Sequence, residues 1–150
     1  MELLYRGSRD GMSGEAFHNK CNNKGSTISL IKNEKGYIFG GYASNDWQGG
    51  NGNYKSAPDS FIFTLTNMYD ISPTKFPNLD NKNSIWNNPS YGPVFGDGKF
   101  DIAIRYPSSH FTHFPSAYKD ILGKGCNIFK GINDKANWIL KEIEVFKLIK

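Results

Sequence analysis

The chain has 150 residues, a length typical of one domain that buries its core without disulfide staples. Its 18 lysines and arginines exceed its 14 acidic residues, which gives a formal net charge of +4. The lysines are scattered and form no basic block of the kind found in nucleic-acid patches. We therefore expect a single domain over residues 1–150 and no nucleic-acid partner.

The chain has two cysteines, Cys21 and Cys126, so at most one disulfide could form. The opening MELLYRGSRDG lacks the apolar core of a signal peptide, and no apolar run is long enough to span a membrane. We expect a cytoplasmic protein with reduced thiols, no transmembrane segment and no bound metal or cofactor.

The first predicted element is a short helix over residues 14–22. Ser13 is placed to cap its first free amides, and Glu15 lies where the helix dipole favours an anion. Phe17 and Cys21 fall on its apolar side, and Gly25 can end it in a left-handed conformation. The polar residues of SGEAFHNKC are thus explained as a capped helix start.

A hairpin is predicted next, with strands over 27–32 and 37–43. The intervening residues 33–36 end in Gly36, which suits the left-handed position of the turn. In the first strand Ile28 and Leu30 share one face while Ser29 and Ile31 share the other, so we expect cover on both sides.

The remaining strands are expected to be short. Phe61, Phe63 and Leu65 face one way in a strand over 60–67, and alternation at the C-terminal end favours a strand over a helix. The other expectations are a loop over 44–58, an irregular or short-strand segment over 68–88, a turn at Gly96 and Gly98, a strand over 99–106, an edge strand over 126–129 and a strand over 138–149. Six or seven strands with one early helix predict a mainly β, α+β chain built as a two-sheet antiparallel β-sandwich.

Three residues of the predicted helix, Glu15, His18 and Cys21, resemble metal ligands or catalytic groups. At successive spacings of three they drift around a helix and cannot converge on one ion. No second pair of cysteine or histidine ligands completes a zinc site. We therefore predict no metal site.

Nucleophilic catalysis is the other chemistry to consider. Ser13 lies in Gly-Met-Ser-Gly-Glu, which lacks the final glycine of a nucleophile elbow. Cys21 could pair in space with His110 or His113, as any chain with these residue types allows. A hydrolase that uses Ser13 or Cys21 stays open as an alternative.

Four stretches taken in order resemble the TLDc domain family. They are LLYRGSRDGMSGEAFHNKC, GYIFGGYAS with Trp47 shortly after, DSFIFTL, and FGDGKFDIAI with the terminal EIEVF. The resemblance spans roughly residues 3 to 148. The helical segment that usually precedes Leu-Leu-Tyr in the family is missing, and residues 68–88 do not align with its pattern.

The resemblance implies a sandwich of two antiparallel sheets with peripheral helices. It also implies a non-catalytic protein-interaction domain, because the family is linked with protection against oxidative damage and has no established catalytic centre. Several of its members bind the vacuolar proton-pumping ATPase, which implies such a partner here and a cytoplasmic location close to organelle membranes. Whether the chain is part of a multidomain protein stays open.

The family motifs point to seven positions as partner-binding candidates. These are Asp10, Gly11, Ser13, Gly40, Gly41, Gly96 and Gly98. The glycines either let a partner approach the backbone closely or serve turn geometry alone. The link to oxidative stress also leaves a second function open, in which Cys21 or Cys126 is itself oxidised.

Overall fold

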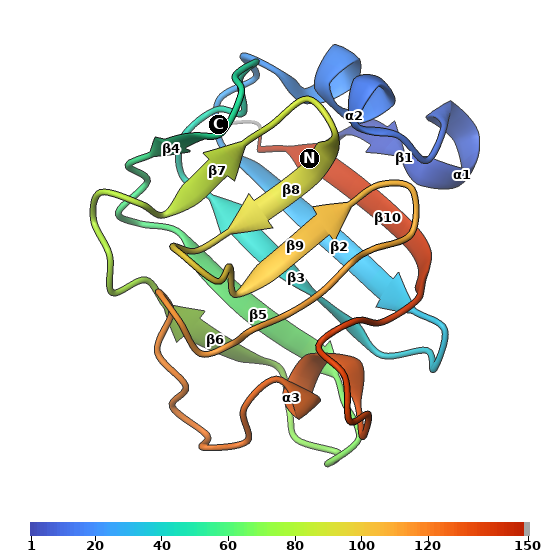
Figure 1. Ribbon diagram of the computed structural model, residues 1–150, viewed down its shortest axis with the longest axis vertical. Helices are drawn as coiled ribbons and strands as arrows, with labels where there is room; N and C mark the ends of the chain where they lie inside the picture. Colours follow the sequence, from blue (N-terminus) through green and yellow to red (C-terminus); the bar gives the residue numbers. More distant parts are fainter. Residues whose placement is uncertain (149–150) are drawn as a thin grey trace.

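The computed structural model, described here for residues 1–148, is a sandwich of two antiparallel sheets (Figure 1). The larger sheet has the strand order β1-β10-β2-β3-β5-β6 and the smaller one β4-β7-β8-β9. The strands are β1 (Glu2–Arg6), β2 (Thr27–Asn33), β3 (Ile38–Ala43), β4 (Asn53–Lys55), β5 (Phe61–Thr66), β6 (Thr74–Pro77), β7 (Ile85–Asn87), β8 (Tyr91–Phe95), β9 (Ile102–Arg105) and β10 (Leu140–Lys147). The helices are α1 (Gly7–Asp10), α2 (Gly14–Cys21) and α3 (Asn127–Lys130). The predicted fold class is confirmed.

Helix α2 begins as its sequence predicts. The backbone N–H of Ala16 donates to Ser13 Oγ at 3.0 Å, so Ser13 satisfies one of the free amides of the first turn. Phe17 and Cys21 are fully buried. Gly25 follows with a φ of 77°, a conformation that suits glycine. The polar cluster of SGEAFHNKC is a capped helix start in the structure.

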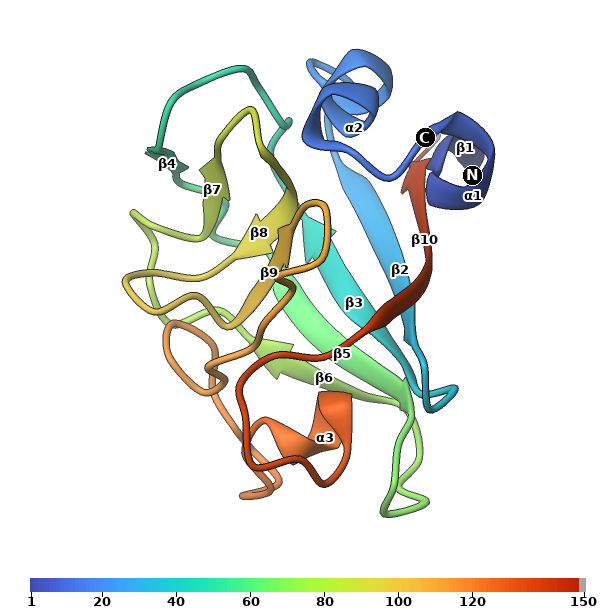
Figure 2. The same cartoon turned by 45° about the vertical axis from the view of Figure 1, so that its right-hand side comes forward.

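The central hairpin of the larger sheet also matches its prediction. Gly36 closes the turn between β2 and β3 with a φ of 88°. Along β2, Ser29 and Ile31 are fully buried, whereas Ile28 and Leu30 on the opposite face are only half-buried. Figure 2 shows the smaller sheet stacked against one face of the larger sheet, so the cover expected on both sides of β2 is present on one.

The strand predicted over residues 126–129 is wrong, because this segment forms helix α3 with Cys126 as its N-cap. The backbone N–H of Lys130 donates to Cys126 O at 3.2 Å, and that of Gly131 donates to Asn127 O at 3.0 Å. Gly125 and Gly131 bracket the segment with φ of 65° and 78°. A five-residue stretch between two left-handed glycines satisfies its amides locally, so it needs no neighbouring strand.

The structure has more strands than the six or seven predicted. Strands β1, β4 and β8 went unpredicted, and β9 is shorter than the strand expected over 99–106. Strand β8 contains Gly92 and Pro93, residues that argue against a strand in sequence. Its pairing with β9 shifts register between Tyr91 and Val94, an irregularity that accommodates a residue without an N–H. The prediction for residue 149 lies outside the described residues.

The two sheets meet where Phe95 of β8 packs on Gly41 of β3. A Cβ atom on Gly41 would lie 2.5 Å from Phe95 Cζ, so the ring occupies the space that a side chain would need. The same ring packs edge-on against Trp47 at 5.6 Å and Tyr118 at 6.3 Å between centroids. All three aromatic side chains are fully buried. This cluster joins both sheets, the loop after β3 that carries Trp47 and the segment after β9 that carries Tyr118 in one core.

A buried carboxylate holds the segment that follows β9. Asp101 accepts the backbone N–H groups of Ser116 and Ala117, both at 2.8 Å, and of Tyr118 at 3.1 Å. Burial raises the pKa of Asp101 to about 6, although these three N–H bonds oppose the shift. A Cβ on Gly96 would overlap Asp101 Oδ1, so the carboxylate fits only against a glycine.

Replacement of Gly41 by alanine should destabilise the domain by about 1–3 kcal/mol, because the added methyl group displaces the buried Phe95 ring. Urea unfolding monitored by tryptophan fluorescence measures the change. Gly49→Ala is the matched control, since the nearest atom to its added Cβ is 4.0 Å away. That control should change stability by less than about 0.5 kcal/mol. Equal effects of the two variants would contradict the proposed packing.

The raised pKa of Asp101 gives stability a pH dependence. The native state holds this proton between about pH 4 and pH 6 while the unfolded state releases it, so the contribution is complete below pH 4 and lost as pH rises through 6. The free energy of unfolding of the parent minus that of Asp101→Asn should therefore fall by about 3 kcal/mol from pH 4 to pH 7. A difference that is constant or that grows over this range would contradict the raised pKa.

Candidate partner-binding surfaces

Asp10, the first of the positions taken from the family motifs, ends helix α1 beside α2. Its carboxylate accepts the backbone N–H of Arg6 at 3.0 Å and two guanidinium N–H groups of Arg9 at 2.9 Å each. The Arg9 bonds, supported by the Arg6 amide, lower the pKa of Asp10 to about 2. Asp10 and Ser13 line a shallow hollow with Glu15 and Lys20. This part of the surface presents a carboxylate that stays ionised at neutral pH.

Gly11 connects this surface to the core. It is exposed, with a φ of 113°, and its carbonyl accepts the hydroxyl of Tyr5 at 2.7 Å. The Tyr5 hydroxyl also lies 2.8 Å from the hydroxyl of Tyr106. Because the Tyr5 proton is donated to Gly11, Tyr106 is the donor in this second bond. Burial raises the pKa of Tyr5 to about 12 and raises that of Tyr106 as well, so both stay neutral. The tyrosine pair fixes the turn that carries Asp10 and Ser13.

Gly40 and Gly41 lie in the middle of strand β3 and are buried. A Cβ on Gly40 would overlap the carbonyl oxygen of Ser29 on the neighbouring strand, and Gly41 is covered by Phe95. The absence of a side chain at both positions is thus explained by close contacts within the fold.

Gly96 and Gly98 lie in the connection between β8 and β9. Gly96 is buried against Asp101, with a φ of 115°. Gly98 is exposed, with a φ of 63°, and its N–H donates to the Tyr54 hydroxyl at 3.1 Å. Of this pair only Gly98 presents its backbone to solvent.

The seven positions do not gather at one site. Figure 1 shows α1 and α2 together at the upper right, while the β8–β9 connection lies toward the left of the smaller sheet. Asp10, Gly11 and Ser13 therefore form one surface, and Gly98 belongs to another. The motif pattern could not separate these groups, because it reports backbone requirements as well as surface contacts.

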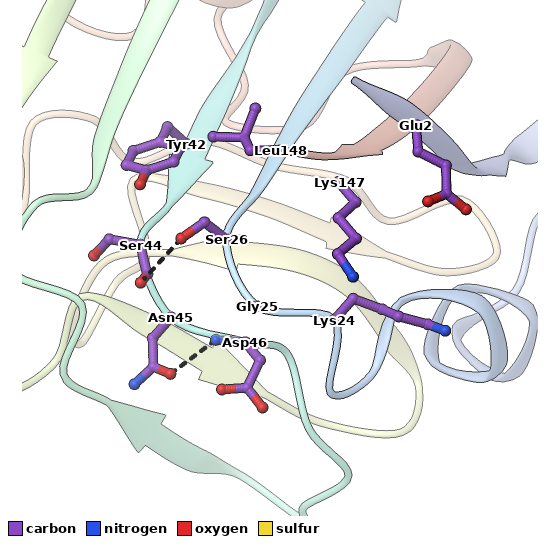
Figure 3. Close-up of a pocket in the computed structure, with 10 residues that line it drawn as sticks. All are labelled: Glu2, Lys24, Gly25, Ser26, Tyr42, Ser44, Asn45, Asp46, Lys147 and Leu148. Atoms are coloured by element: carbon purple, nitrogen blue, oxygen red, sulfur yellow. Dashed lines mark hydrogen bonds between the residues drawn. The ribbon is translucent and has the colours of Figure 1, made fainter. Parts of the chain in front are cut away.

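A larger hollow of about 890 Å³ opens at one end of the six-stranded sheet (Figure 3). Glu2, Lys24 and Lys147 lie on one side of it in this view, and Asn45 and Asp46 on the other. Ser26 Oγ donates to the Ser44 carbonyl oxygen at 3.3 Å in its wall, and the Asp46 N–H donates to Asn45 Oδ1 at 2.8 Å. Tyr42, Leu148 and Gly25 complete the lining.

The charges in this hollow are mixed. Burial tends to raise the pKa of Asp46, but the Lys55 hydrogen bond and charge outweigh it, so the pKa lies below its ordinary value. Lys55 Nζ lies 3.1 Å from Asp46 Oδ1. Lys24 and Lys147 make no ion pair within residues 1–148. A wide opening with charges of both signs suits a protein surface better than a small apolar ligand.

The two thiols differ in their surroundings. Cys21 is fully buried, and burial raises its pKa to about 12. Cys126 is half-buried, and both cysteines are free. A thiol with a pKa near 12 carries little thiolate at neutral pH, so Cys21 is a poor nucleophile.

Two of the groups considered for catalysis or metal binding, Ser13 and His18, are engaged in hydrogen bonds within the fold. Ser13 Oγ caps α2, and the ring nitrogens of His18 lie 2.7 Å from Asn22 Oδ1 and 2.9 Å from Asn88 O. His110 is 2 % exposed, and burial lowers its pKa to about 4. Within residues 1–148, no three histidine, cysteine, aspartate or glutamate side chains gather as metal ligands would.

Sequence reasoning missed the residues that line the large hollow and the carboxylate of Asp101. The hollow is assembled from β1, the α2–β2 connection, the end of β3 and β10, so no local pattern marks it. Asp101 had a usable signal, since a carboxylate directly before the apolar strand Ile102–Arg105 is a residue that needs local hydrogen-bond donors.

In the described part of the chain, 1–148, every helix is too short or too polar to cross a bilayer. Comparison with known proteins finds a local match to MTOR-associated protein MEAK7 of Danio rerio, 45% identical over 40 residues. That match covers 25% of this chain and 9% of the relative, so the chain spans a small part of that protein's length. The model of the TLDc domain matches residues 1–149, nearly the whole sequence. The chain therefore belongs to the TLDc domain family.

Proposed function

We propose that this chain is a non-catalytic protein-interaction domain that binds subunits of the vacuolar proton-pumping ATPase and contributes to protection against oxidative damage. The observation that carries the proposal is the match of the TLDc model to residues 1–149. The ATPase and the protective role follow from the resemblance to family members. The proposal includes one domain over residues 1–150, located in the cytoplasm and reaching organelle membranes through its partner.

The surface chemistry supports protein binding. The hollow of Figure 3 is wide and carries the carboxylates of Glu2 and Asp46 together with Lys24 and Lys147, which form no ion pair within residues 1–148. Charges placed this way raise association rates and select partners by complementarity. The surface of Asp10, Gly11 and Ser13 is a second candidate contact, held rigid by the tyrosine pair beneath it.

The name of the zebrafish relative offers a second partner class. It records an association with MTOR, and the local match of 40 residues supports testing the same association for this chain. Because that match covers 9% of the relative, we place it after the ATPase proposal.

Affinity capture tests the partner. The full chain, immobilised and incubated with cytosol and solubilised organelle membranes, should retain subunits of the proton-pumping ATPase, identified by mass spectrometry. The double variant Lys24→Glu/Lys147→Glu should reduce their recovery at least about tenfold, because it reverses the cationic side of the hollow. The thermal midpoint of this double variant should match that of the parent, which shows that the variant is folded. Recovery of no pump subunit by the folded parent chain would reject the ATPase assignment.

The redox alternative makes a different prediction. Because burial raises the pKa of Cys21 to about 12, a thiol reagent should modify Cys21 at least about a hundredfold more slowly in the native chain than in urea. Mass spectrometry of each cysteine-containing peptide measures the two rates, with half-buried Cys126 as the internal comparison.

Cell protection separates the two functions. If the chain acts by binding, the variant Cys21→Ala/Cys126→Ala should protect cells from peroxide as well as the parent at equal expression. Loss of protection in this variant, with partner capture intact, would favour direct oxidation of a thiol.

A further inference from the structure

The larger sheet has a second, apolar face that is turned away from the smaller sheet. Strand β2 contributes Ile28 and Leu30 to it, and β5 contributes Phe61, Phe63 and Leu65. With Lys75 these residues line a groove of about 460 Å³, named here the outer groove. A surface of contiguous apolar side chains on a sheet face marks an interaction site.

Gly40 of β3 lies between the two strands that supply the apolar residues of the outer groove. The strand register places Gly40 directly between Leu30 of β2 and Phe63 of β5. Because Gly40 has no side chain, the Phe63 ring lies over it, with Cζ 3.2 Å from the position that a Cβ of Gly40 would take. The apolar lining of the groove therefore comes mainly from β2 and β5.

Two lysines lie beside the outer groove. Lys75 lies opposite Phe63 in register, and its ammonium lies 4.6 Å from the centroid of the Phe61 ring. Lys32 follows two positions after Leu30 on the same face of β2. Within residues 1–148 neither lysine makes an ion pair or a side-chain hydrogen bond.

The carboxylates on the same face have partners of their own. Glu144 lies opposite Leu30 and is bound by Arg6, with Nη2 to Oε2 at 2.6 Å. Glu142 lies opposite Lys32 and accepts the backbone N–H groups of Ser8 and Ile143. Lys32 and Lys75 are cations beside the outer groove that form no ion pair within residues 1–148, and an acidic occupant complements them.

The backbone of the sheet decides the conformation of the occupant. Strands β2, β3 and β5 are each paired on both sides, so their N–H and C=O groups already form hydrogen bonds to neighbouring strands. An extended peptide laid on this face would leave its own backbone groups without partners, whereas a helix satisfies them internally. The face thus favours a helix over an added strand.

The dimensions fit one helix. Lys32 and Lys75 lie on β2 and β6, which are three inter-strand spacings apart, or about 14 Å. An α-helix of about 10 Å diameter fits between them with its axis over β3 and β5. The six residues of β5 span about 20 Å, which equals roughly 13 helical residues.

We propose that the outer groove binds an acidic amphipathic helix of a partner protein. The apolar side chains of that helix, at positions i, i+3, i+4 and i+7, lie between Leu30 and Phe63. Its flanking carboxylates pair with Lys32 and Lys75. The inference rests on the proposed function and names the kind of partner segment that this face recognises. It does not depend on the identity of the partner protein.

The probe is a synthetic 18-residue helix with leucine at positions i, i+3, i+4 and i+7 and glutamate on both flanks. The control peptide has the same sequence with lysine in place of glutamate. Isothermal titration at about 50 mM salt should show the full chain binding the acidic helix at least about tenfold more tightly than the basic one. The variant Lys32→Glu/Lys75→Glu should lose at least about tenfold in affinity for the acidic helix. The matched control, Lys99→Glu/Lys135→Glu, reverses two exposed lysines elsewhere and should bind like the parent.

The thermal midpoints of both double variants, measured by circular dichroism, should match that of the parent, which separates lost binding from lost folding. Absence of binding at 1 mM peptide, or equal affinity in the Lys32→Glu/Lys75→Glu variant, would overturn the proposal. A dimer of the parent in sedimentation equilibrium that Leu65→Asp abolishes would assign the groove to a second copy of the chain and also overturn it. Helix binding without capture of pump subunits would keep the groove and reject the ATPase as partner.

Discussion

The contact of the Phe95 ring with the bare backbone of Gly41 is the constraint on which the sandwich depends. The ring fills the space between the sheets, and it packs on Trp47 and Tyr118 at the same time. A side chain at position 41 would push the sheets apart there, and the loss of close packing would extend through the aromatic cluster. The spacing of the two sheets at this point follows from the contact.

The fold satisfies its buried polar groups in ways that also shape the surface. The tyrosine pair supports the turn of Asp10, Gly11 and Ser13, and Asp101 holds the segment after β9 through three backbone amides. These bonds fix the backbone conformation of the turn and of the segment after β9. A rigid surface loses little conformational entropy on binding, which favours recognition of a protein partner.

The two faces of the larger sheet have different roles in this account. The inner face packs against the smaller sheet through fully buried side chains such as Ile31 and Ile62. The outer face keeps Ile28, Leu30 and Phe61 half-buried, beside lysines that form no ion pair in the described residues 1–148. The mixed-charge hollow at the sheet end adjoins the outer groove, because Tyr42 of the hollow is paired in register with Ile28 and Phe61 of the groove.

Sequence patterns predicted the parts of the fold in which local chemistry and tertiary contacts agree. Ser13 as a cap, Gly36 as the hairpin turn and the alternation of β5 are examples, because each is decided within a few residues. Strand β8 was missed because Pro93 is tolerated at a register shift that depends on β9. The segment that begins at Cys126 was wrongly predicted as a strand, because Gly125 and Gly131 separate it from its neighbours and it forms the short helix α3 instead.

The candidate surfaces were less predictable than the fold. The family motifs led to Asp10, Gly11 and Ser13, which are close together. They also led to Gly41 and Gly96, where buried neighbours within the fold leave no room for a side chain. The large hollow joins residues far apart in the chain, so it follows only from the assembled sheets.

Nuclear magnetic resonance directly tests the contact between Gly41 and Phe95 that joins the two sheets. In the native chain, the two α-protons of Gly41 should show Overhauser contacts to the ring protons of Phe95 and shifts displaced from their random-coil values by the ring current. Gly41 α-protons with random-coil shifts and no contact to Phe95 would contradict the account.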